Sequence, residues 1–166
     1  MTQKKCIGQK YEYYLKDKLG SGSFAEVVMG KNILTNEVVA IKVIQKSVLS
    51  KYGEGIINQI QLEVKILHKL ANLTKQTICP FINRIYEFIE TANYFYIILE
   101  FCNQGTLFDM IQKQKKIEER EAIFILFQLL QAFTLLADNN IAHRDIKPEN
   151  VFIKDGVYMG FGTSYS

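Results

Sequence analysis

The chain has 166 residues, of which 48% are hydrophobic and 22% are charged. These values fit one medium-sized folded domain and exclude a disordered acidic or basic tail. The net charge is +3, and the lysines are scattered rather than gathered into a basic stripe with interleaved aromatic residues. Such a stripe is typical of nucleic-acid binders, so we expect no nucleic-acid partner.

The cysteines and histidines exclude a disulfide framework and a zinc site. Cys6, Cys79 and Cys102 are far apart and odd in number, which is typical of reduced cysteines in a cytosolic protein. The two histidines, His68 and His143, have no Cys or His neighbours at metal-ligand spacing. We therefore expect no structural metal and a cytoplasmic location.

Membrane targeting is also not expected. The N-terminus lacks the apolar core of a signal peptide. The most apolar stretch, residues 122–137, is shorter than the roughly 20 residues that span a bilayer. This stretch predicts a buried helix, and we expect no membrane partner.

The first half of the chain predicts strands. Residues 13–31 and 37–44 are rich in β-branched, aromatic and alternating apolar residues, and glycines and a turn at 35–36 divide them into three hairpin-connected strands. Residues 81–90 and 94–101 predict two more strands, joined by a turn at 91–93.

Helical spacing appears in three other segments. Apolar residues recur with a helical period over residues 56–70, and further helices are predicted at 106–114 and 119–139. Strands followed by helices, with antiparallel hairpins, indicate an α+β fold.

The first chemical motif is Gly-Ser-Gly-Ser-Phe-Ala-Glu-Val at residues 20–27, between two predicted strands. Glycines allow a backbone to approach phosphates without Cβ clashes, and Phe24 is able to cover such a loop. Two glycines are also common in ordinary hairpins, so this motif alone does not establish a nucleotide site.

The second motif is Val-Ala-Ile-Lys at residues 39–42. A lysine at the end of a buried strand is costly unless it is paired, and phosphates together with a carboxylate would pair it. Glu63 on the predicted helix is the natural carboxylate. An edge-strand Lys42 and an exposed Glu63 would explain the same pattern without a site.

The third motif, residues 143–150, reads His-Arg-Asp-Ile-Lys-Pro-Glu-Asn and follows the charge-free helix. Asp145 has the chemistry to accept a proton from an attacking hydroxyl. Lys147 would neutralise a transferring phosphoryl group, and the carbonyl oxygen of Asn150 suits a hard cation. An accidental surface turn is a poor explanation for this string.

Taken together and in order, these motifs resemble the eukaryotic protein kinase family from about Tyr13 to Thr163. Lys147 and the following Pro-Glu-Asn are similar to the serine/threonine branch. The resemblance implies a protein kinase-like α+β fold with a five-stranded antiparallel N-lobe sheet and one regulatory helix. It places the ATP-binding N-lobe at 13–101 and the hinge with an incomplete, mainly helical C-lobe at 102–166.

The resemblance also implies the role of each matching residue. Asp145 would be the catalytic base, assisted by Lys147, Lys42 and Glu63, while Asn150 would bind magnesium. The ATP-binding residues would come from the glycine-rich loop, the strands and the hinge: Gly20, Ser21, Gly22, Ser23, Phe24, Val27, Ala40, Lys42, Leu99, Glu100, Cys102 and Phe152. The second substrate would be a protein with a serine or threonine acceptor.

One position departs from the family pattern. The Asp-Phe-Gly triplet that binds magnesium is matched by Gly-Phe-Gly at residues 160–162, and Asp155-Gly156 is interpreted as the turn of the preceding hairpin. Magnesium held by one carboxamide without this carboxylate should bind weakly. We expect ATP binding to persist while phosphoryl transfer is severely impaired.

The family's activation segment, Ala-Pro-Glu anchor and later helices have no counterpart in these residues. Part of the apolar surface of helix 119–139 would then be exposed and would imply a partner protein. Three interpretations are open: a serine/threonine kinase whose recorded sequence is incomplete, a non-catalytic nucleotide-binding pseudokinase, and a kinase fragment without function.

Overall fold

The computed structural model describes residues 3–22, 25–49, 65–66, 69–73 and 79–159. Its strands are β1 (Lys4–Ile7), β2 (Tyr11–Ser21), β3 (Ala25–Asn32), β4 (Val38–Gln45), β5 (Ile85–Glu90), β6 (Tyr94–Glu100), β7 (Phe152–Lys154) and β8 (Val157–Met159). Its helices are α1 (Lys46–Leu49), α3 (Leu107–Gln114), α4 (Glu119–Asp138) and the short 3-10 helix η2 (Pro148–Asn150). Residues 65–66 and 69–73 are also helical, as predicted for the end of the 56–70 segment, whose other residues lie outside the described ones.

The described chain divides into two compact units. The first contains the described residues of 1–73 and 84–101, and the second contains residues 79–83 and 102–159. The lobe boundaries 13–101 and 102–166 remain a prediction, and residues 79–83 group with the second unit.

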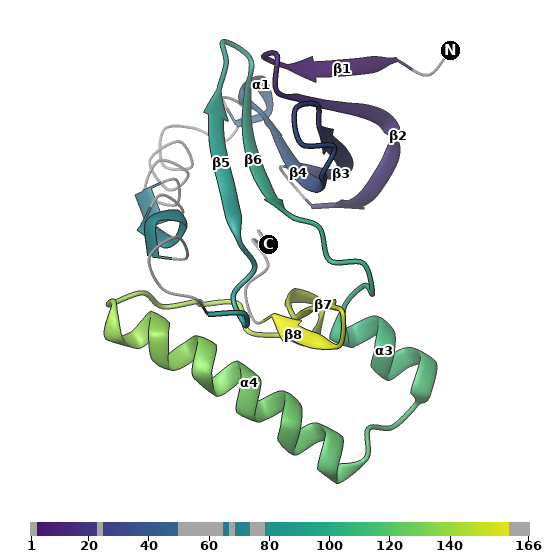
Figure 1. Cartoon of the computed structure of the whole chain (residues 1–166), viewed down its shortest axis with the longest axis vertical. Helices are drawn as coiled ribbons and strands as arrows, with labels where there is room; N and C mark the ends of the chain where they lie inside the picture. Colours follow the sequence, from purple (N-terminus) through teal and green to yellow (C-terminus); the bar gives the residue numbers. More distant parts are fainter. Residues whose placement is uncertain (1–2, 23–24, 50–64, 67–68, 74–78, 160–166) are drawn as a thin grey trace. The chain divides into compact units, whose positions relative to one another are not determined.

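The first unit is built on an antiparallel sheet with the strand order β1-β2-β3-β4-β6-β5. The five strands predicted from the alternating pattern are all present, although β5 begins at Ile85 rather than at residue 81. The sheet has one strand more than predicted, because β1 pairs with β2 in the register Lys4 to Tyr14 and Ile7 to Tyr11. Figure 1 shows β1 beside β2 at the edge of this sheet.

The two faces of the sheet carry different residues. One face holds an apolar core with several aromatic side chains, made of Ile7, Tyr11, Tyr13, Val28, Val39, Ile41, Tyr96 and Ile98. Side chains alternate between faces along a strand, so Ala40 and Lys42 of β4 point to the opposite face from Ile41. The predicted nucleotide-binding residues of β4 therefore lie on the face of the sheet opposite the core of the unit.

The second unit has its own core, to which α3, α4 and the β7–β8 hairpin contribute. Its buried members are Leu107, Ile125, Leu129, Val151, Ile153 and Tyr158. Helix α3 begins in a capping box, since the Thr106 hydroxyl accepts from Asp109 N and the Asp109 carboxylate accepts from Thr106 N at 2.9 Å. This capping lowers the pKa of Asp109, chiefly through the hydrogen bond from the Thr106 side chain.

The hairpin that precedes the predicted triplet is confirmed. Asp155 and Gly156 join β7 to β8 with φ of 50° and 79°, which are left-handed conformations that suit a tight two-residue turn. The Ile153 amide donates to Gly105 O at 2.9 Å, so β7 is held against the residues that lead into α3.

The prediction that the apolar stretch 122–137 forms a buried helix is wrong for one of its faces. Ala132 and Leu136 are buried, but five large apolar side chains of α4 are more than half exposed: Ile123, Phe124, Leu126, Phe127 and Leu130. This confirms the separate prediction that part of helix 119–139 presents apolar surface. By length and composition alone α4 is able to cross a membrane, which is weak evidence because core helices of soluble proteins also meet these criteria.

Candidate functional site

In the first unit, strand pairing brings parts of the first two motifs side by side. Gly20 of β2 lies opposite Val27 of β3, and Val27 lies opposite Lys42 of β4. Directly opposed residues of an antiparallel sheet point to the same face. The glycine-rich turn, an apolar side chain and a lysine thus form one row across three strands.

Lys42 is only 2% exposed, which makes it one of the most buried charged residues in the described part of the chain. Burial at this level is costly for an ammonium group without compensating negative charge. Glu63, its predicted partner, lies outside the described residues, so the predicted ion pair stays a prediction.

Two further apolar residues predicted to contact the nucleotide share the face of Lys42. Ala40 precedes Lys42 by two positions on β4 and lies opposite Leu99 of β6. Ala40 is 9% exposed and Leu99 is 6% exposed. Val27, Ala40 and Leu99 therefore lie on the same side of the sheet as the lysine, and their contact with adenine stays a prediction.

The two predicted hinge residues are also placed. The Glu100 amide donates to Arg84 O at 2.9 Å, so its N–H is engaged within the first unit. Cys102 belongs to the second unit, where its Sγ approaches the Sδ of Met159 at 3.8 Å. Phe152, which pairs with Met159 across the β7–β8 hairpin, is half-buried there.

The third motif forms the loop between α4 and β7. Asn139 caps α4, and Asn140 and Arg144 adopt left-handed conformations with φ of 54° and 68°. His143 packs edge-on against Phe133 of α4, with ring centroids 6.4 Å apart. The loop is thus anchored to the helix, while Arg144 is exposed.

Asp145 is the centre of a polar cluster in this loop. Lys147 Nζ lies 3.1 Å from Asp145 Oδ2, and Asn150 Nδ2 donates to the same oxygen at 2.9 Å. The Asp145 amide donates to His143 Nδ1 at 3.1 Å. Three residues that the motif predicted to act together, Asp145, Lys147 and Asn150, are therefore in direct contact.

Asn150 is 5% exposed, and both hydrogens of its amide are in use. Nδ2 donates to the Asp145 backbone oxygen at 2.8 Å and to the Asp145 carboxylate at 2.9 Å. An amide group has two donors and one carbonyl oxygen, so the oxygen is the group that remains for a hard cation. The donor set therefore fits a single magnesium ligand at this residue.

Several predicted site residues lie outside the described ones: Ser23, Phe24, Glu63 and the triplet 160–162. Within the described ranges, no cluster of three or more His, Cys, Asp or Glu side chains is arranged to hold a metal ion.

One positioning contact was not anticipated. Gln128 is 3% exposed in α4, and its Oε1 accepts from the Tyr158 amide of β8 at 2.8 Å. The Tyr158 hydroxyl donates to Glu121 at 3.2 Å, and burial, followed by this carboxylate, raises the pKa of Tyr158. A glutamine inside a charge-free apolar helix was the available signal, because a buried amide needs a polar partner.

Comparison with known proteins identifies the class. The family model described as "Protein kinase domain" matches residues 13–160. The chain belongs to the protein kinase family.

The chain is similar to several proteins that are named as kinases. A SNF1-related protein kinase catalytic subunit alpha KIN12 from Arabidopsis thaliana is 36% identical over 92% of this chain and 29% of that protein. A maternal embryonic leucine zipper kinase from Danio rerio is 36% identical over 87% of this chain and 20% of its own length. A calcium-dependent protein kinase 4 from Plasmodium berghei is 35% identical over 82% of this chain and 24% of its own length. The chain thus spans less than a third of the length of these relatives.

Proposed function

We propose that this chain is part of a protein serine/threonine kinase that binds ATP and directs its γ-phosphate to serine or threonine hydroxyls of a protein. The observation that carries the proposal is the Asp145 carboxylate, which is held at Oδ2 by Lys147 and Asn150. A carboxylate fixed by charged and amide donors is suited to the role of an oriented base. Similarity to a protein from Dictyostelium discoideum that is named as a probable serine/threonine-protein kinase supports the acceptor class.

In the proposed reaction, the hydroxyl oxygen of the acceptor bonds to the γ-phosphorus of ATP. The bond from that phosphorus to the bridging oxygen breaks, and ADP leaves with the electron pair. Asp145 receives the hydroxyl proton, and the Lys147 ammonium neutralises charge on the transferring group. Lys42 supplies the positive charge for the α- and β-phosphates, and Val27, Ala40 and Leu99 supply apolar surface for the base.

Magnesium fits the residues only in part. Asn150 offers one carbonyl oxygen, whereas a carboxylate is missing at Gly160, where the family pattern places one. Bound magnesium would neutralise phosphate charge, but a single amide ligand holds it weakly. The residues therefore support ATP binding more strongly than phosphoryl transfer.

Nucleotide binding tests the proposal directly. Replacing Lys42 with Met is expected to weaken ATP binding by the purified chain at least about tenfold, because charged hydrogen bonds to the phosphates are lost. Isothermal titration calorimetry with ATP measures this change. Lys31→Met on the exposed part of β3 is the matched control and should leave the affinity unchanged.

Equal ATP affinity in wild type and Lys42→Met, with Lys42→Met still folded by circular dichroism, would contradict the proposed nucleotide site. So would the absence of any ATP binding by the folded wild-type chain.

A second candidate function has one specific observation in its favour. Gly160 lacks the carboxylate of the family triplet, which is what a pseudokinase acting through nucleotide-dependent contacts would show. ATP binding with no detectable phosphoryl transfer, both in wild type and in Gly160→Asp, favours this candidate, and the lack of any nucleotide binding favours a fragment without function.

We also propose that a protein partner covers the exposed face of α4 and that the protein works in the cytoplasm. The face carries Phe124, Phe127 and Leu130, which are 55%, 60% and 62% exposed. An apolar patch of this kind is typical of interaction surfaces. Cys6, Cys79 and Cys102 form no disulfide in the described part of the chain, which agrees with a reducing compartment.

The isolated chain is accordingly expected to bind a hydrophobic dye, and Phe127→Glu should lower the dye fluorescence by reducing the apolar patch. Fluorescence titration measures this, with Lys113→Glu on the polar side of α3 as the control. A soluble monomeric chain that binds no dye would count against an uncovered apolar face.

A further inference from the structure

The first unit contains a cavity that the proposed phosphotransfer chemistry does not use. Its volume is about 370 Å³, within the range of small-molecule sites. Its walls include Tyr13, Leu15, Val28 and Val43. Val28 and Tyr13 belong to the core face of the sheet, so the cavity lies on the face opposite Ala40 and Lys42.

An irregularity in β2 opens this cavity. Tyr13 lies opposite Gly30 of β3, but the next paired residue, Lys18, lies opposite Val28. The chain advances five residues along β2 while its partner β3 advances two, so the extra residues of β2 form a bulge outside the hydrogen-bonded ladder. Figure 1 shows the strong bend of β2 along its length. Leu15, within the bulge, forms part of the wall.

The added strand β1 brings a cation to the cavity. Lys5 pairs directly with Tyr13, and its ammonium lies over the ring of Tyr94 at 5.4 Å from the centroid. Because β1 and β6 are not neighbours in the strand order, Lys5 reaches across the curled sheet. Among the described carboxylates, none forms an ion pair with Lys5, whereas Glu26 on the cavity wall is paired with Lys18 at 2.8 Å.

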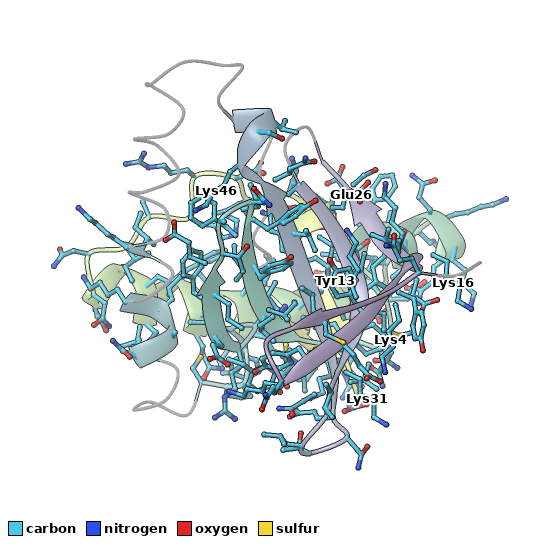
Figure 2. The ribbon with its side chains drawn as sticks, turned by 90° about the horizontal axis from the view of Figure 1, so that it is seen from above. Lys4, Tyr13, Lys16, Glu26, Lys31 and Lys46 are labelled. Carbon is cyan, nitrogen blue, oxygen red and sulfur yellow. The ribbon has the colours of Figure 1, made fainter. Side chains whose placement is uncertain are left out.

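Tyr13 also lines the cavity. Tyr13 is 2% exposed, and its hydroxyl has no hydrogen-bond partner with standard geometry in the described part of the chain. Its ring meets Tyr96 edge-on with centroids 6.5 Å apart. Burial, followed by the neighbouring Tyr96, raises the pKa of Tyr13, so the phenol stays protonated at neutral pH and remains a donor. This hydroxyl interacts with the Tyr96 side chain and is itself buried, so Tyr13 contributes its bulk to the cavity wall and leaves the binding of an anion to Lys5. Figure 2 labels Tyr13 and Glu26, which come from the adjacent strands β2 and β3.

We propose that this cavity is a second ligand site, which takes a small carboxylate with an apolar body. The carboxylate meets Lys5, and the apolar body meets Leu15, Val28 and Val43. Ser21 and Gly22 also line the cavity, so an occupant contacts the glycine-rich turn from the side away from Lys42. The site is independent of the proposed function and stands whether or not the chain transfers phosphate.

The probe is 4-phenylbutanoate, titrated into the isotope-labelled 166-residue chain and followed by two-dimensional NMR. Methyl signals of Leu15, Val28 and Val43 and amide signals of Ser21 and Gly22 are expected to shift saturably at about millimolar concentration. Lys5→Met should weaken binding roughly tenfold, because the charged partner of the carboxylate is lost. The neutral analogue 4-phenylbutanamide should bind roughly tenfold more weakly than the acid.

Controls separate the site from unspecific charge effects and from unfolding. Lys16→Met removes an exposed lysine that lies over the Tyr14 ring and does not line the cavity, and it should bind like wild type. Lys5→Arg keeps the positive charge and should retain most of the affinity, which shows that β1 is intact. No saturable shift at these nuclei, or equal affinity in wild type and Lys5→Met, would overturn the proposal. Shifts confined to the opposite face, around Ala40 and Leu99, would overturn it as well.

Discussion

Replacing Gly160 with aspartate is expected to make ATP binding by this chain depend on magnesium. Wild-type affinity should change less than about threefold between magnesium and EDTA, because Asn150 offers a single neutral ligand. In Gly160→Asp, magnesium should tighten binding at least about tenfold, since the new carboxylate binds the cation and repels metal-free phosphates. Calorimetry with ATP in the two buffers measures the difference.

Any phosphoryl transfer by Gly160→Asp should exceed that of wild type on the order of 10³-fold, because the loss of a charge-stabilising group costs several kcal/mol.

The matched control is Gly160→Asn, because asparagine has nearly the same size as aspartate but carries no charge. It should behave like wild type if charge at the metal is what matters. Robust magnesium-dependent phosphorylation by the wild-type chain, abolished by Asp145→Asn, would contradict the premise that Gly160 impairs transfer. If instead Gly160→Asp leaves the magnesium dependence unchanged, residues 160–162 do not correspond to the family triplet.

Replacing Ile41 with alanine is expected to destabilise the first unit by about 2–5 kcal/mol. Ile41 is fully buried in the core face of the sheet, against neighbours that include Val28 and Ile98. Removing its side chain beyond Cβ forfeits buried apolar surface and leaves a cavity that the paired strands cannot easily close. Chemical denaturation followed by tyrosine fluorescence and circular dichroism measures the free energy of unfolding.

Val38→Ala on the same strand is the control, because Val38 is 45% exposed. It should cost less than about 1 kcal/mol. Similar losses for both substitutions would show that β4 is not buried on the Ile41 face, and the assigned core would then be wrong.

Local pattern predicted most of the fold. The alternation of apolar residues located β2, β3, β4 and β6 and most of β5, and the helical period located α3 and α4 to within one residue at each end. The four-residue strand β1 was missed because two lysines and one cysteine give it no alternation. Its only strong apolar residue, Ile7, is buried by partners distant in sequence, such as Tyr96.

The candidate site was predictable to a similar degree. Residues 143–150 are contiguous, so their chemistry was visible in the sequence, and the structure places Asp145, Lys147 and Asn150 in contact. That Asn150 uses both amide hydrogens on Asp145 was not predictable, since it depends on how the loop folds back on itself. Gln128 was visible as a polar residue in α4, but its acceptor role toward Tyr158 depends on the docking of β8.

By itself, the sequence determined the class of protein, the order of its elements and the residue types of the loop at 143–150, because motifs and periodicity are properties of neighbouring residues. Only the tertiary structure decided which face of α4 is buried, how β1 extends the sheet and where β2 leaves its ladder to open a cavity beside Lys5. These features depend on contacts between residues far apart in the chain, whose free energies are not set by local pattern.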